Sequence, residues 1–144
     1  MPTTITSAGV TFNDTTSLTS ANIGTAQLVN GSVTAEKLGT TEQKQIAKAW
    51  VNFDGTLATP ITPRASFNVS SVTKNGTGDY TVNFATAMAD ANYSANISSS
   101  GTTSDQPIIA IDSNTTTTFR GLITGRPTGA PGDAAIVSVT IFGN

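Results

Sequence analysis

Alternating apolar and polar positions dominate the chain from residue 49 onward, and this period of two is typical of half-buried β-strands. The alternation falls into seven short segments. They are Ala49/Val51/Phe53; Ala65/Phe67/Val69, continuing to about Thr73; Tyr80/Val82/Phe84; Tyr93/Ala95/Ile97; Pro107 to Ile111; Thr117/Phe119 with Leu122 and Ile123; and Ala135/Val137/Val139/Ile141. Turn-forming residues separate them, and the strongest hairpin signal lies at Lys74 to Asp79. The pattern predicts a mainly β fold, an antiparallel β-sandwich or barrel.

The last of these segments is apolar on parts of both faces. Ile136 and Phe142 alternate with the Val137/Val139/Ile141 series and therefore lie on the opposite face of the strand. We expect one face of this strand to pack into the core and the other to contact another subunit.

Aromatic residues divide the chain into two parts. Only Phe12 precedes Trp50, and the other aromatic residues follow it. Aromatic side chains carry much of the buried area of a core. Residues 1–48 are therefore expected to form an extended attachment or shaft segment without a core of its own, and residues 49–144 a β-sandwich head domain.

The leading segment holds a possible repeat and a predicted helix. Ile23 to Leu28 is followed ten residues later by Val33 to Leu38 with the apolar ends in register, either a repeat or a coincidence of composition. Thr40 and Gln43 have the spacing of a capping box, and Ile46, Ala49 and Trp50 follow at helical spacing. We predict a short helix at about residues 41–49.

Scattered apolar residues in this polar segment need partners that the segment itself cannot supply. Copies of the chain in closed symmetry supply them. We therefore expect contacts between subunits at Phe12, Leu28, Leu38, Ile46 and Trp50. For Trp50 an equal alternative is a place in the core of the head domain.

Composition and charge remove several classes of function. Charged residues make up 11% of the chain, and the net charge is −2. No basic cluster suited to phosphate neutralisation is present, so nucleic acid is not an expected partner. The N-terminus has no signal-peptide pattern, and no apolar run approaches the ~20 residues of a transmembrane helix, so no membrane insertion is expected.

Candidate chemistry is sparse because the sequence contains no cysteine and no histidine. Disulfides, Cys/His zinc sites and histidine catalysis are excluded. The carboxylates after residue 48 are Asp54, Asp79, Asp90, Asp105, Asp112 and Asp133. Asp105 and Asp112 are the pair that could flank a glycosidase site, but most of these residues have turn neighbours, which favours turn capping. We expect no catalytic residue, no metal and no cofactor.

The longest predicted loops span residues 54–63, 98–106 and 124–134. Loops on a rigid β scaffold are where recognition residues gather. The third loop combines Arg126 and Asp133 with two prolines. We take Asp105, Arg126 and Asp133 as candidate receptor-binding residues, with an ordinary solvated loop as the alternative.

Several segments together resemble the C-terminal module of bacteriophage tail-fibre proteins. They are residues 49–55 (AWVNFDG), 64–84 (RASFNVSSVTKNGTGDYTVNF), 89–93 (ADANY) and 137–142 (VSVTIF). Residues 9–16 are similar to the opening segment of many such fibres, although Thr15 stands where glycine is usual, and residues 30–38 resemble their shaft repeats. The resemblance implies a homotrimer with a distal host-recognition domain and an N-terminal part that docks on the virion. It transfers no binding residues, because residues 98–134 lie outside it.

These observations predict a tail-fibre structural protein that attaches to the host cell surface by non-catalytic receptor binding. Its expected partners are copies of itself, tail or baseplate proteins through the N-terminal segment, and a bacterial surface glycan or protein receptor. Its expected location is the virion, after assembly in the host cytoplasm. The alternative is a purely structural virion component, such as a head or neck fibre or an adaptor for another fibre. An enzyme such as a capsule depolymerase is a distant third.

Overall fold

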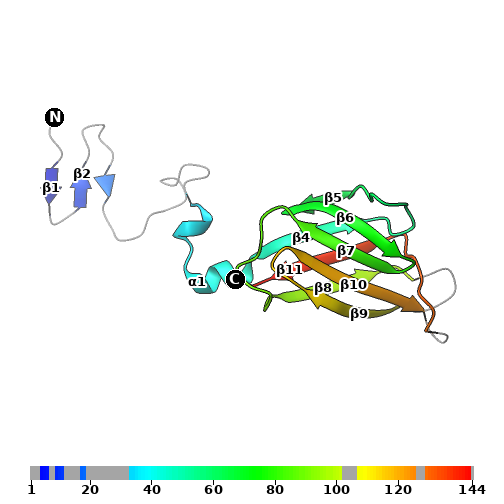
Figure 1. The fold of residues 1–144 in the computed structure, drawn as a ribbon. Helices are drawn as coiled ribbons and strands as arrows, with labels where there is room; N and C mark the ends of the chain where they lie inside the picture. Colours follow the sequence, from blue (N-terminus) through cyan, green and yellow to red (C-terminus); the bar gives the residue numbers. More distant parts are fainter. Residues whose placement is uncertain are drawn as a thin grey trace. The chain divides into compact units, whose positions relative to one another are not determined.

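The computed structural model describes residues 4–6, 9–11, 17–18, 33–101, 107–125 and 129–143 (Figure 1). The chain divides into two compact units, Met1–Gly39 and Thr40–Asn144. In the first unit, β1 (Thr4–Thr6), β2 (Gly9–Thr11) and β3 (Ser17–Leu18) form an antiparallel sheet in that order. A 3-10 helix, η2 (Ala35–Lys37), follows. Two expected subunit contacts, Phe12 and Leu28, lie outside the described residues.

The second unit consists of one short helix, α1 (Thr40–Gln45), and two four-stranded antiparallel sheets. One sheet has the order β5-β4-β11-β8, formed by β5 (Ala65–Phe67), β4 (Ala47–Phe53), β11 (Val137–Phe142) and β8 (Ser94–Ser99). The other has the order β6-β7-β10-β9, formed by β6 (Val69–Gly76), β7 (Asp79–Phe84), β10 (Thr118–Gly125) and β9 (Pro107–Asn114). The predicted mainly β, antiparallel fold is confirmed for this unit.

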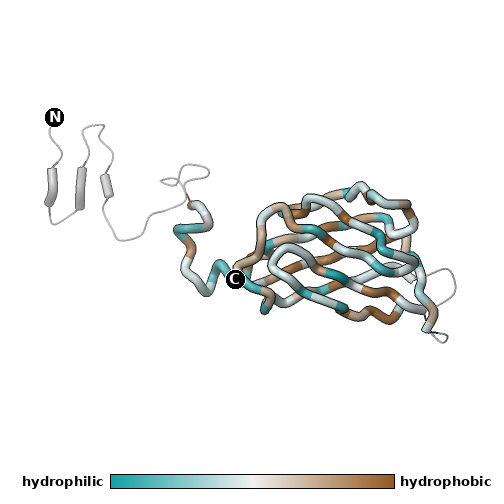
Figure 2. The backbone as a smooth tube through the Cα atoms, in the orientation of Figure 1, coloured by the Kyte–Doolittle hydropathy of each residue, from teal (hydrophilic) through white to brown (hydrophobic). Residues whose placement is uncertain are grey.

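The core of the second unit lies between the two sheets, as in a sandwich. Alternate residues of strands from both sheets point into one buried cluster, and apolar positions recur along the strands (Figure 2). Its largest fully buried side chains are Tyr80, Phe53, Phe119, Ile61, Ile123, Ile141, Val51, Val72, Val82, Val137 and Val139. The rings of Phe53 and Tyr80 join the two sheets at a centroid distance of 5.2 Å in an edge-on arrangement. Burying such apolar side chains stabilises a fold by about 1.5–3 kcal/mol each.

The predicted helix at 41–49 is wrong in its second half. Helix α1 ends at Gln45, and Ala47 and Ala49 belong to β4, where they pair with Phe142 and Ile141 of β11. Pairing with β11 supplies backbone hydrogen bonds to this stretch, and Ala49 is fully buried. Tertiary packing therefore overrides the local helical spacing.

The predicted strand from Ala65 to Thr73 is two strands, so the second unit has eight strands and not seven. Asn68 separates β5 from β6 and has a φ of 53°, in the left-handed region that asparagine tolerates better than most residues. The chain passes here from one sheet to the other. As a result Phe67 is 55% exposed, whereas Val69 packs against the core.

The two predicted faces of the last strand are both present. Val137, Val139 and Ile141 are buried, while Ile136 and Phe142 are exposed. Trp50 is 39% exposed, so its placement in the core is wrong. In the described part of the chain no helix has the length and apolar character that crossing a bilayer requires.

Candidate functional site

The outward face of the β5-β4-β11-β8 sheet carries exposed aromatic side chains. Trp50 of β4 lies directly opposite Phe67 of β5 on one side and opposite Thr140 of β11 on the other. Phe142, two residues after Thr140, is also exposed, and a register shift after Ile141 pairs it with Ala47 of β4. We call this surface, which contains Trp50, Phe67 and Phe142, the aromatic face.

Every exposed aromatic residue among the described positions lies on the aromatic face. The other five described aromatic residues are in the core; they are Phe53, Tyr80, Phe84, Tyr93 and Phe119. Ile46, 48% exposed, directly precedes β4. Exposed apolar side chains gathered on one face mark a surface of interaction, whereas scattered ones do not.

The aromatic face is also almost free of charge. Lys48 is the only charged residue in the four strands of this sheet, all of which are described. Its polar members are amides and hydroxyls, such as Asn52, whose Nδ2 donates to Ser138 Oγ at 2.8 Å. This combination suits a partner that is itself uncharged at the contact.

The outward face of the other sheet is different, because its polar groups bind one another. Arg120 of β10 makes two hydrogen bonds to Asp79 of β7, from Nε to Oδ1 at 2.9 Å and from Nη2 to Oδ2 at 2.6 Å. Its Nη1 lies 3.1 Å from Asp112 Oδ2. The bonds from Arg120 lower the pKa of Asp79, although burial opposes this, and the same contacts raise the pKa of Arg120. The one positive charge of Arg120 is thus shared between two carboxylates of the same sheet.

Asparagine amides extend this polar network along β6 and β7. Asn83 Nδ2 donates to Ser71 Oγ at 3.0 Å and to Thr73 Oγ1 at 3.3 Å. Asn75 Nδ2 donates to Asp79 Oδ1 and to Thr81 Oγ1 at 3.0 and 2.8 Å. The two sheets of the second unit therefore differ in their exposed groups: one carries paired polar side chains together with the exposed Ile108 and Ile111 of β9, and the other presents exposed aromatic rings.

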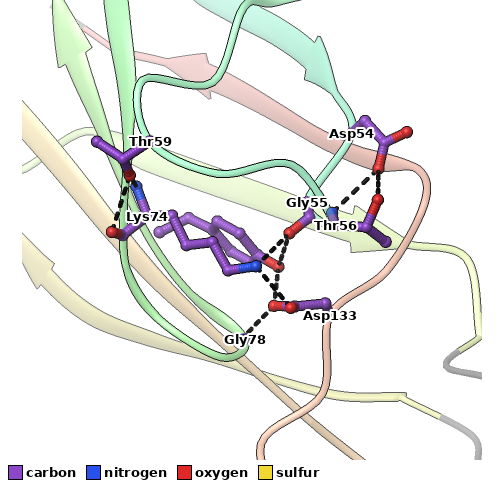
Figure 3. Close-up of polar contacts among 8 residues, drawn as sticks. Asp54, Gly55, Thr56, Thr59, Lys74, Gly78 and Asp133 are labelled. Atoms are coloured by element: carbon purple, nitrogen blue, oxygen red, sulfur yellow. Dashed lines mark hydrogen bonds and ion pairs between the residues drawn. The ribbon is translucent and has the colours of Figure 1, made fainter.

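A cluster around Asp133 joins both sheets at one end of the second unit (Figure 3). Asp133 Oδ2 accepts a hydrogen bond from Lys74 Nζ at 2.6 Å, and Oδ1 accepts one from the backbone N–H of Gly78 at 2.9 Å. The Tyr80 hydroxyl lies 2.8 Å from Asp133 Oδ1 and 3.0 Å from the carbonyl oxygen of Gly55, so two acceptors share its hydrogen. Lys74 Nζ also donates to the Gly55 carbonyl at 3.0 Å. We call these five residues the Asp133 clasp.

The clasp sets the ionisation of its members. Burial alone would raise the pKa of Asp133, but the hydrogen bonds from Lys74, Gly78 and Tyr80 outweigh burial and lower it. Burial, together with the neighbouring Asp133 carboxylate, raises the pKa of the Tyr80 phenol. At neutral pH the clasp is therefore an ionised carboxylate held by one ammonium, one phenol and one amide.

Of the three candidate receptor-binding residues, the structure describes only Asp133. Both carboxylate oxygens of Asp133 are engaged within the fold, and Pro131 of the same loop forms an isolated β-bridge with Thr124. Asp105 and Arg126 lie outside the described residues. Asp133 thus has a structural task that sequence reasoning missed, since nothing in the sequence indicated that Lys74 would lie beside it.

Turn capping is confirmed for two of the six carboxylates. Asp54 Oδ1 accepts from the backbone N–H of Thr56 at 3.0 Å, and Asp90 Oδ1 from that of Asn92 at 2.7 Å. Asp54 also forms an ion pair with Arg64, and Asp79, Asp112 and Asp133 form ion pairs with Arg120 or Lys74. Among the described residues no group of three or more His, Cys, Asp or Glu is placed to hold a metal ion.

A pocket of about 330 Å³ opens beside the aromatic face. Its lining residues are Lys44 of α1, Asn92 and Ser94 at the start of β8, and Phe142 and Gly143 at the end of β11. Ser94 and Phe142 are cross-strand partners, which fixes the width of the pocket on that side. This pocket was not predicted from the sequence, because its residues come from three distant segments.

The expected subunit contacts that fall in the described part of the chain are Leu38, Ile46 and Trp50. Leu38 is half-buried in the first unit, and Ile46 and Trp50 are exposed in the second. Phe67, which sequence analysis placed on a core-facing strand, joins Trp50 on the outward surface. Comparison of the chain with family models, with curated proteins and with solved structures finds no match.

Proposed function

We propose that this chain is a bacteriophage tail-fibre protein that forms a homotrimer and attaches to the host cell surface by non-catalytic receptor binding. The observation that carries the proposal is the aromatic face, which presents Trp50 and Phe67 side by side to solvent. The resemblance of residues 49–55 and 64–84 to tail-fibre modules supplies the biological setting.

The aromatic face favours association between copies of the chain. Trp50 and Phe67 are 39% and 55% exposed, and covering such side chains contributes about 1.5–3 kcal/mol each when burial is complete. In a closed ring of three copies, a charge that lies near the symmetry axis meets the same charge of the other two copies, so like charges there would repel one another. Lys48 is the only charge in these four described strands, and a symmetric contact here brings few like charges together.

Receptor binding is assigned to polar groups displayed on the rigid two-sheet scaffold. The Asp133 clasp ties Asp133, just before β11, to β6 and the β6–β7 turn, and Asp105 and Arg126 remain the proposed contacts to a bacterial surface glycan or protein. In this proposal the N-terminal segment docks on tail or baseplate proteins, and the assembled fibre is part of the virion.

Adhesion to whole bacteria tests this function. Fluorescently labelled full-length protein is expected to bind host cells saturably and to be displaced by excess unlabelled protein. The double variant Asp105→Asn/Arg126→Gln is expected to lose adhesion, whereas the control Glu36→Gln/Lys37→Gln, which removes the same two charges elsewhere, retains it.

Other outcomes contradict the proposal. Binding to purified tail or head subassemblies without any binding to cells would make the chain a structural component of the virion. Release of sugar from capsule or cell-wall polysaccharide would make it an enzyme.

A further inference from the structure

The pocket formed by Lys44, Asn92, Ser94, Phe142 and Gly143 combines groups of different chemistry within one described unit. Lys44 supplies a cation, Asn92 an amide, Ser94 a hydroxyl and Phe142 a ring that is 38% exposed. The volume of about 330 Å³ is at the lower end of small-ligand pockets, which span ~300–1,000 Å³.

The backbone of Gly143 lies close against Tyr93, the residue that precedes Ser94. A Cβ on Gly143 would lie 2.8 Å from the Cβ of Tyr93, so only glycine permits this approach. Tyr93 is itself buried, and its hydroxyl donates to the carbonyl oxygen of Thr118 at 2.9 Å. One side of the pocket therefore adjoins the core through Tyr93.

The polar groups of the pocket have no partner among the described residues. Lys44 forms no ion pair there, and the Asn92 amide and the Ser94 hydroxyl form no side-chain hydrogen bond. By contrast, the amides of Asn52, Asn68 and Asn83 are all bonded within the fold. The pocket thus offers a cation, two amide donors, an amide acceptor and a hydroxyl to a ligand.

These groups match the chemistry of an acidic sugar. The Lys44 ammonium pairs with a carboxylate, and Asn92 and Ser94 bind ring hydroxyls. The π face of Phe142 is electron-rich and suits the polarised C–H face of a pyranose. A neutral sugar would leave Lys44 unmatched, and a simple anion would leave Phe142 and Asn92 unused.

We infer that this pocket binds one uronic-acid-type residue of an acidic saccharide. The inference deepens the proposed host attachment, and it rests on that function for the source of the sugar. The geometry assigns the charge contact to Lys44 and the stacking contact to Phe142. A free acidic sugar and an acidic sugar within a bacterial surface polymer present the same carboxylate, hydroxyls and C–H face to the pocket.

Titration of the full-length, isotope-labelled protein followed by NMR tests the pocket. Glucuronate is expected to shift the amide signals of Asn92, Ser94 and Gly143, while glucose, which carries a hydroxymethyl group in place of the carboxylate, binds at least about tenfold more weakly. Equal binding of glucose, or an equal effect of inorganic phosphate on the same signals, would overturn the inference. A glucuronate oligosaccharide that binds more tightly than the monomer assigns the pocket to a polymer, and equal affinity assigns it to the free sugar.

Two variants and one matched control locate the contact. Lys44→Gln is expected to weaken glucuronate binding about tenfold, and Phe142→Leu, which keeps the apolar area but removes the ring, several-fold. Lys48→Gln removes a charge on the neighbouring strand outside the pocket and is expected to leave binding unchanged. Equal losses in Lys44→Gln and Lys48→Gln would show a diffuse charge effect and contradict the assignment.

Different results would contradict the proposed cell attachment and the proposed sugar pocket. If the protein does not bind glucuronate and Lys44→Gln still adheres saturably to cells, the pocket proposal is wrong and the attachment proposal stands. If the protein binds glucuronate but adheres to no cell, the attachment proposal is wrong and the pocket proposal stands.

Discussion

The ammonium of Lys74 lies 2.6 Å from Asp133 Oδ2, and this ion pair joins β6 to the loop before β11. Both side chains are largely covered, with 17% and 25% exposed. Because removal of one partner leaves the other charge partly buried, Asp133→Asn is expected to destabilise the second unit by about 1–3 kcal/mol. Urea denaturation followed by fluorescence measures this.

The matched control is Asp112→Asn. Asp112 forms an ion pair of similar type with Arg120, but both side chains are more exposed, at 37% and 40%. Solvent screens such a pair, so the expected cost is below about 1 kcal/mol. Equal losses in the two variants would contradict the structural task assigned to the clasp.

Acid is expected to weaken the second unit through the carboxylates whose pKa the fold lowers. One is Asp54, whose pKa the hydrogen bonds from Thr56 lower, and the two that are less exposed to solvent are Asp79 and Asp133. The folded state lowers the pKa of Asp79, mainly through Arg120, and of Asp133, where hydrogen bonds outweigh burial. A lowered pKa stabilises the fold above the ordinary value of 3.8 and loses that contribution as the pH falls below it. Melting temperatures measured from about pH 5 to pH 2 should fall, and Asp133→Asn should flatten part of that decrease. If the melting temperature falls equally steeply with pH in Asp133→Asn and in the parent, Asp133 does not contribute to the acid sensitivity.

Alkali is expected to act on Tyr80. Its folded-state pKa is raised above the ordinary value of 10 by burial and by Asp133, so the phenol contributes stability below that value and loses it as the pH rises further. Tyr80→Phe should reduce the alkaline loss without abolishing it, because burial also raises the pKa of Tyr93. Denaturation of the parent and of Tyr80→Phe, measured over a series of alkaline pH values, gives the comparison. The same loss of stability with pH in both proteins would contradict the role assigned to Tyr80.

Gly78 and Gly129 form a matched pair for backbone strain. Both have a positive φ, 67° and 68°, but a Cβ on Gly78 would collide with the carbonyl oxygen of Ile123, whereas a Cβ on Gly129 meets nothing within 4 Å. Gly129→Ala is expected to cost about 1 kcal/mol from the left-handed conformation alone, and Gly78→Ala substantially more. Denaturation curves of both variants check the order, and the reverse order would contradict the described hairpin.

The sequence predicted the strands because their burial follows the period of two. Val137, Val139 and Ile141 and the 74–79 turn are local patterns, and the structure contains both. The break at Asn68 was missed because alternation continues across it, and only the change of sheet sends Phe67 outward and Val69 inward. The end of α1 was missed because the capping pattern is local, while the pairing of Ala47 with Phe142 is not.

The candidate sites were harder to predict because they depend on which strands become neighbours. Trp50 lies beside Phe67, Arg120 beside Asp79, and Lys74 beside Asp133 only through the order of the sheets. No single segment carries a signal for such pairs. Ile46 and Trp50 were expected at a subunit contact, and that role stays a prediction.

The mass of the assembled protein tests the central proposal, that Trp50 and Phe67 of the aromatic face are covered by copies of the chain. Analytical ultracentrifugation of the intact protein is expected to give three times the 14.7 kDa of one chain. The double variant Trp50→Ser/Phe67→Ser is expected to shift toward the monomer with its second unit folded, whereas Leu57→Ser, which removes an apolar side chain that is 46% exposed outside this sheet, keeps the parent mass. A folded monomer for the intact protein, or an unchanged mass for the double variant, would contradict the account.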